Sequence, residues 1–170
     1  IQTNPHVPVV VMEFDKYPEI KKGLAAKNLS GGFSLTPQNT IGKDGDTRLI
    51  PAQKRGSIPP HIRVQQKSRY TWQIYVEGPG TLQADASYAF QCEQPDVRIK
   101  VTAAGSSLEH EVKPTGMTVG EPNRDWHIKS FESQYLGKIK ITEAGYYNIS
   151  LEIQPEDEPI DFQWLWLDER

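Results

Sequence analysis

The chain has 170 residues, enough for one domain with a sizeable core, and its 13 Gly and 13 Pro favour short strands joined by turns over long helices. The formal net charge is −3 and no run of Lys or Arg is present, so we exclude nucleic acid as a partner. No apolar run approaches the roughly 18 residues that span a bilayer, so we expect no membrane partner.

The first third of the chain predicts one strand followed by many turns. The β-branched run at residues 7–14 predicts a strand. Residues 19–27 allow at most a weak helical turn, and between 33 and 60 Gly and Pro recur so often that only short strands fit. We therefore expect a single module, with a linker-like N-terminal strand and loop at 1–32 and a sandwich core at 33–170.

The second half alternates polar and apolar residues with the period of a strand. Trp72, Ile74 and Val76 share one face of the first such segment. Further strands are predicted at 82–90, 97–101, 107–112, 137–141, 146–153 and 161–167. No helix is long enough for a parallel crossover, so the strands should pair antiparallel. The sequence predicts an all-β fold, a two-sheet antiparallel sandwich with Greek-key or jelly-roll-like connections.

Residue types that carry catalysis or bind metals are scattered along the chain. Cys92 is the only cysteine, so we expect a small buried hydrophobe there, and the four histidines show no ligand spacing. The carboxylates of Asp85, Glu93, Asp125 and Glu132 could serve glycoside hydrolysis, but nothing in the sequence brings two of them to a cleft. We predict no catalytic residue, no metal site and no cofactor.

One aromatic candidate for binding lies in a polar loop. An exposed indole at Trp126 would stack on a pyranose ring, while Asn123, Arg124, Asp125 and His127 would bond its hydroxyl groups. The competing interpretations are that Trp126 caps the end of the sandwich or packs on a neighbouring domain. We favour these two together over sugar binding.

A second aromatic candidate lies near the C-terminus. Strict alternation puts Phe162, Trp164 and Trp166 on one face, and Leu165 and Leu167 on the other. One of the two faces must point away from the core. If it is the tryptophan face, it would form an apolar patch typical of a binding or domain interface.

Four segments resemble the C-terminal region of bacterial α-L-fucosidases of the retaining glycoside hydrolase family 29 type. They are VVVMEFD at 9–15, GFSLTP at 32–37, WQIYVEGPG at 72–80 and LGKIKITEAG at 136–145. The resemblance implies a β-sandwich that follows a catalytic barrel in an exported enzyme, periplasmic or secreted. The barrel of the same parent chain would then be its partner. No catalytic residue carries over, because those of the family lie in the barrel.

Three functions follow, in order of preference. The first is a non-catalytic accessory module of a glycoside hydrolase, which supports the catalytic domain and binds carbohydrate weakly. The second is a structural or protein-interaction sandwich of a surface protein. The third is a small independent hydrolase, which a deep pocket with two close carboxylates would indicate. Because the sequence starts at Ile1, we expect a mature or excised fragment.

Overall fold

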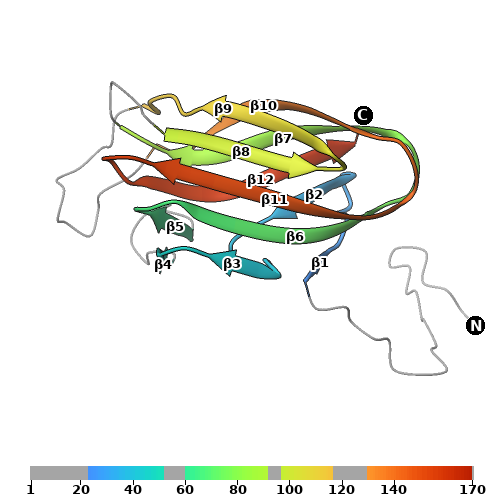
Figure 1. Ribbon diagram of the computed structural model, residues 1–170, viewed down its shortest axis with the longest axis horizontal. Helices are drawn as coiled ribbons and strands as arrows, with labels where there is room; N and C mark the ends of the chain where they lie inside the picture. The colour runs from blue at the N-terminus through green and yellow to red at the C-terminus, as the bar shows by residue number, and fades with distance from the viewer. Residues whose placement is uncertain (1–22, 52–59, 92–96, 117–129, 170) are drawn as a thin grey trace, which may run out of the picture.

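The computed structural model describes residues 23–51, 60–91, 97–116 and 130–169, and this part of the chain contains strands and turns but no helix (Figure 1). Sheet A contains β1 (Leu24–Ala25), β3 (Gly42–Asp44), β6 (Ser68–Val76), β8 (Val97–Ala103), β9 (Ser106–Glu111) and β11 (Gly145–Pro155). Sheet B contains β2 (Gly32–Leu35), β4 (Thr47–Ile50), β5 (His61–Val64), β7 (Gly80–Ala89), β10 (Glu132–Ile141) and β12 (Ile160–Glu169). The predicted two-sheet antiparallel sandwich is confirmed.

The alternation in the sequence decides which face of each strand is buried. Trp72, Ile74 and Val76 of β6, which were predicted to share one face, lie together in the core, while Tyr75 between them is exposed. The buried residues of the two sheets form one apolar cluster between them. The indole Nε1 of Trp72 donates a hydrogen bond to the backbone oxygen of Thr36 at 2.8 Å, which offsets the cost of burying this polar group.

The chain passes repeatedly from one sheet to the other. From β5 to β12, successive strands alternate between the sheets except at the β8–β9 hairpin. These crossings are typical of jelly-roll-like sandwiches and give the two sheets a shared core. Figure 1 shows that β12 ends near the end of the molecule where the β6–β7 and β10–β11 connections turn.

The N-terminal part of the described chain differs from the sequence prediction. Residues 24 and 25 form β1 and are not part of a helical turn. Their backbone pairs with the edge of β6, and this pairing is more stable than a short isolated helix would be. This pair is parallel, whereas every other strand pair in the described residues is antiparallel. β1 and Gly32 therefore already belong to the sheets, inside the predicted linker.

Two further points concern what was predicted. The sequence did not indicate β5, which contains only four residues and directly follows two prolines in the sequence. The predicted strand at 7–14 and Cys92 lie outside the described residues.

Candidate functional site: an aromatic surface on sheet B

A β-bulge in β12 sets the direction of the C-terminal aromatic side chains. Phe162 lies opposite Tyr88 of β7, but Trp164 lies opposite the next residue of that strand, Ser87. Gln163 is therefore an extra residue on β12, and its side-chain Oε1 accepts a hydrogen bond from Ser87 Oγ at 2.9 Å. A bulge of this kind interrupts the alternation of faces along a strand.

The predicted common face of Phe162, Trp164 and Trp166 is wrong for Phe162. That side chain is fully buried in the core together with Leu165, because the bulge adds one residue between Phe162 and Trp164. Trp164 and Trp166 lie on the outer face of sheet B and are half-buried. The strand thus buries one aromatic side chain and displays two.

A second bulge lies on the other neighbour of β7. Tyr135 of β10 pairs with Asp85, and Gly137 pairs with the preceding residue of β7, so Leu136 is the extra residue. Leu136 is buried, whereas Tyr135 is 51% exposed on the outer face. Gly137 has φ +143°, a backbone conformation that residues other than glycine rarely adopt. The central strand β7 is therefore flanked by two bulged strands that direct aromatic residues outward.

The pairing register brings these residues together. Tyr135, Asp85 and Trp166 form one row across β10, β7 and β12, and Ser87 and Trp164 continue the next row. Directly opposite side chains on one face lie about 5 Å apart at Cβ. We call this set, Tyr135, Trp164 and Trp166 with Asp85 and the buried Ser87 beside them, the aromatic surface.

Trp166 is held in place by the neighbouring strand β2. A Cβ atom added to Gly32 would lie 2.4 Å from Cζ2 of Trp166, so the indole rests directly on the glycine backbone. This contact restricts the ring before any ligand arrives, which lowers the entropy lost on binding.

Asp85 supplies the polar centre of the aromatic surface. Gln83 Nε2 donates a hydrogen bond to Asp85 Oδ2 at 3.0 Å. Among the described residues, no donor contacts the other carboxylate oxygen, which can accept hydrogen bonds from a ligand. The surface therefore combines apolar ring faces with an acceptor between them, and it suits a ligand with an apolar face and hydroxyl donors.

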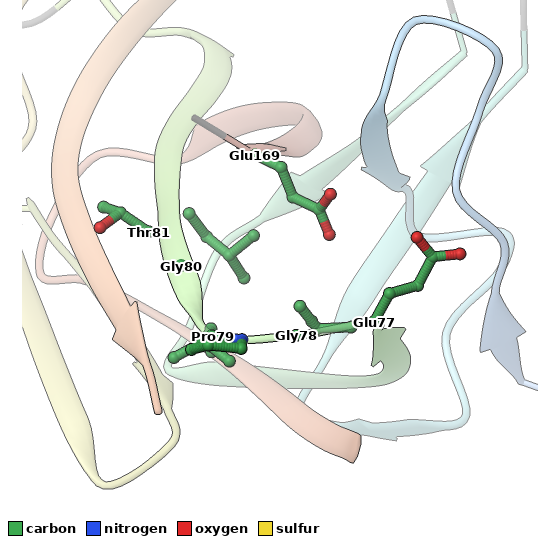
Figure 2. A pocket seen from close by; sticks show the side chains of 9 residues that line it. Glu77, Gly78, Pro79, Gly80, Thr81 and Glu169 are labelled. Carbon is green, nitrogen blue, oxygen red and sulfur yellow. The ribbon is translucent and has the colours of Figure 1, made fainter. Parts of the chain in front are cut away.

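A hollow of about 260 Å³ opens at the end of the sandwich beside the β6–β7 turn (Figure 2). Its apolar lining includes Val76, Leu82 and Ile141, and its acidic lining residues are Glu77 and Glu169. Figure 2 shows the two carboxylates entering from different elements, Glu77 after β6 and Glu169 from the end of β12.

Two carboxylates at a hollow are the sign by which the hydrolase hypothesis would be recognised. Here Lys27 Nζ forms an ion pair with Glu169, and this hydrogen bond raises the pKa of Lys27. Glu169 is therefore engaged as the partner of a lysine.

The outer face of sheet A carries another pair of exposed aromatic residues. Tyr75 of β6 and Tyr146 of β11 are directly opposite, with ring centroids 5.0 Å apart. In the neighbouring row Gln73 Nε2 donates to Asn148 Oδ1 at 3.2 Å. Cross-strand pairs of this kind stabilise a sheet, and this face lacks a carboxylate between its rings.

The binding loop predicted around Trp126 stays a prediction. Asn123, Arg124, Asp125, Trp126 and His127 lie outside the described residues. His110 has the expected polar role, since its Nε2 lies 3.3 Å from Tyr88 Oη and burial lowers its pKa.

Two features are absent from the described residues. No group of three or more His, Cys, Asp or Glu side chains is placed to hold a metal ion. In the same part of the chain, no helix has the length and apolar character that a membrane crossing requires.

Sequence reasoning did not select Tyr135 for the site, and it treated Asp85 only as a catalytic candidate. The alternation Leu82, Ala84, Ala86 did indicate that Asp85 faces outward. Its aromatic neighbours could not be found in the same way, because they depend on the register between β7, β10 and β12.

Fold and surface together define a class: a jelly-roll-like β-sandwich that displays aromatic side chains on the outer face of one sheet. No family model matches the sequence, and no curated protein does. The resemblance to α-L-fucosidases therefore stays a prediction.

Solved structures share the fold at low identity. The mosquito-larvicidal Cry4Aa toxin from Bacillus thuringiensis is 15% identical with a TM-score of 0.61. The match covers 88% of this chain but only 25% of the toxin. The C-terminal family 6 carbohydrate-binding module of a marine laminarinase from Zobellia galactanivorans is 16% identical with a TM-score of 0.55. This match covers 81% of the present chain and 99% of the module. A family 35 carbohydrate-binding module from Clostridium thermocellum is 11% identical with a TM-score of 0.56, and the match covers 81% of the present chain and 97% of that module.

Proposed function

We propose that this chain is a non-catalytic carbohydrate-binding module and that it binds glycans through the aromatic surface. The observation that carries the proposal is the grouping of Tyr135, Trp164 and Trp166 around Asp85 on one outer sheet face. Pyranose rings present C–H faces that stack on aromatic rings, and their hydroxyl groups donate to carboxylates. The similarity to two modules named for carbohydrate binding, over nearly their whole length, supports the same function.

The shape of the site indicates weak binding along a glycan chain. The three rings lie on a sheet face and not in a deep cleft, so sugar units would contact one side only. Each stacked aromatic ring contributes about 1 kcal/mol beyond area burial. We therefore expect dissociation constants of about 0.1–1 mM.

We propose further that the module belongs to an exported bacterial glycosidase, periplasmic or secreted, that resembles an α-L-fucosidase. A catalytic barrel of the same parent chain would be its partner, and the module would hold that barrel near its substrate. This rests on the segments at 32–37, 72–80 and 136–145. The residues encoded on either side of this sequence test the idea directly, since a barrel with paired catalytic carboxylates is expected there.

The binding proposal is tested by replacing one ring of the aromatic surface. Trp166→Ala should weaken binding to neutral polysaccharides about tenfold in affinity gel electrophoresis and calorimetry, because it removes a stacking ring that packs against Gly32 before binding. Tyr75→Ala is the matched control, since it removes an exposed aromatic ring from the other sheet.

Two outcomes would contradict the proposal. Equal loss of binding in both variants, with unchanged stability, would remove the assignment to sheet B. Absence of saturable binding by the unmodified module to any fucosylated or other glycan of a broad panel would favour a structural or protein-interaction role.

A further inference from the structure

A single carboxylate lies at the centre of the aromatic surface. Asp85 stands between Tyr135 and Trp166 in one cross-strand row. A sugar ring stacked on either aromatic side chain would therefore bring its substituents within reach of Asp85. These substituents decide whether the contact is favourable.

No cation in the described residues neutralises Asp85. Its hydrogen-bond donor is the uncharged amide of Gln83. Lys138 lies in the adjacent row, opposite Gln83, and forms no ion pair with Asp85. The row that contains Ser87 adds no charge. Within the described residues, the aromatic surface therefore carries between its rings one carboxylate that is in no ion pair.

We infer that the aromatic surface selects neutral glycans and rejects glycans with carboxylate or sulfate groups, and that Asp85 is the residue responsible. This inference rests on the proposed function. A carboxylate accepts hydrogen bonds from sugar hydroxyl groups, and these charge-assisted hydrogen bonds are stronger than those between neutral groups. An anionic substituent in the same place has no donor to offer and is repelled, so specificity arises from an unfavourable contact with the wrong ligand.

The test compares polysaccharides that share a backbone but differ in charge. Hydroxyethylcellulose is compared with carboxymethylcellulose, and dextran with dextran sulfate, by affinity electrophoresis at low salt. We expect the charged member of a bound pair to bind at least about tenfold more weakly. The difference should shrink as sodium chloride is raised, because salt screens the repulsion.

Asp85→Asn provides the variant that isolates the charge. The amide has nearly the same shape, so stacking is retained, and binding of the anionic member should rise toward that of the neutral member. Asp157→Asn, in the exposed β11–β12 turn, changes the net charge equally and should leave the discrimination unchanged.

The outcomes separate the two proposals. Equal binding of neutral and charged polysaccharides by the unmodified module, or unchanged discrimination in Asp85→Asn, overturns the role of Asp85 while glycan binding stands. If neither member of either pair nor any neutral glycan binds, both proposals fail. Discrimination that disappears equally in Asp157→Asn would assign it to net charge and reject the local carboxylate.

Discussion

At the scale of single residues, the buried hydroxyl of Tyr70 makes the module sensitive to alkali. Tyr70 is fully buried in the core. Burial raises its pKa to about 12, and the hydroxyl groups of Thr47 and Ser68 oppose this only in part. An ionised phenol would be a charge in an apolar interior, which the folded state resists.

This pKa predicts how stability changes with pH. In the unfolded chain a tyrosine ionises near pH 10, so from about pH 10 to 12 the unfolded state loses its proton first. The contribution of Tyr70 is complete below about pH 10 and is lost as the pH rises through about 12. The free energy of unfolding measured in urea should fall by about 2–3 kcal/mol over this pH range.

Tyr70→Phe serves as the control for this titration. The variant keeps the ring but has no proton to release, so its stability should fall less than that of the unmodified module over the same pH range. Identical profiles for the two proteins would show that Tyr70 does not titrate on unfolding.

At the scale of elements, the bulges of β10 and β12 do the most to form the aromatic surface. Each inserts one residue opposite β7, and each lies directly beside an aromatic residue that faces outward. Bulges occur often next to functional sites because they redirect a side chain without ending the strand. The hydrogen bond from Ser87 Oγ to Gln163 Oε1 stabilises the bulge in β12.

Deletion of Gln163 tests the description of this bulge. Removing the extra residue would leave Phe162 facing inward and Trp164 facing outward in a regular ladder. We therefore expect a folded protein that loses about 1–2 kcal/mol in urea unfolding, mainly from the lost hydrogen bond.

The matched control is deletion of Lys100, which lies in the regular ladder of β8 with Glu152 and Glu109 as neighbours. That deletion moves every later side chain of the strand to the opposite face and should prevent folding. If deletion of Gln163 is equally damaging, the bulge is not an insertion into an otherwise regular strand.

At the scale of the whole molecule, the described strands share one core. The buried side chains of both sheets form a single cluster, and strands that follow one another in sequence lie on opposite sides of it. Neither sheet can bury its apolar face without the other. Domains built in this way usually unfold in one step.

We therefore expect one cooperative unfolding transition. Urea curves from tryptophan fluorescence and from far-ultraviolet circular dichroism should coincide, both in Trp72→Phe and in the double variant Trp164→Phe, Trp166→Phe. The first variant removes the indole buried in sheet A, and the second removes those on the outer face of sheet B. Separate midpoints for the two probes would show that the sheets unfold independently.

The sequence by itself determined the strands from β6 onward and, where the ladder is regular as in β6 to β8, which residues of a strand share a face. Period-two alternation is local, so Trp72, Ile74 and Val76 identify their own inner face. Short strands such as β1 and β5 were missed because a few residues carry no period. Their conformation comes from the strands with which they pair.

Only the tertiary structure decided which outward residues meet. Tyr135, Asp85 and Trp166 are far apart in the sequence and become neighbours through the register of three strands. Strict alternation assigned Phe162 to the wrong face because the extra residue Gln163 is recognisable only against β7. Pairing between distant strands, with one residue more on one side than on the other, is a non-local property, and the aromatic surface depends on it.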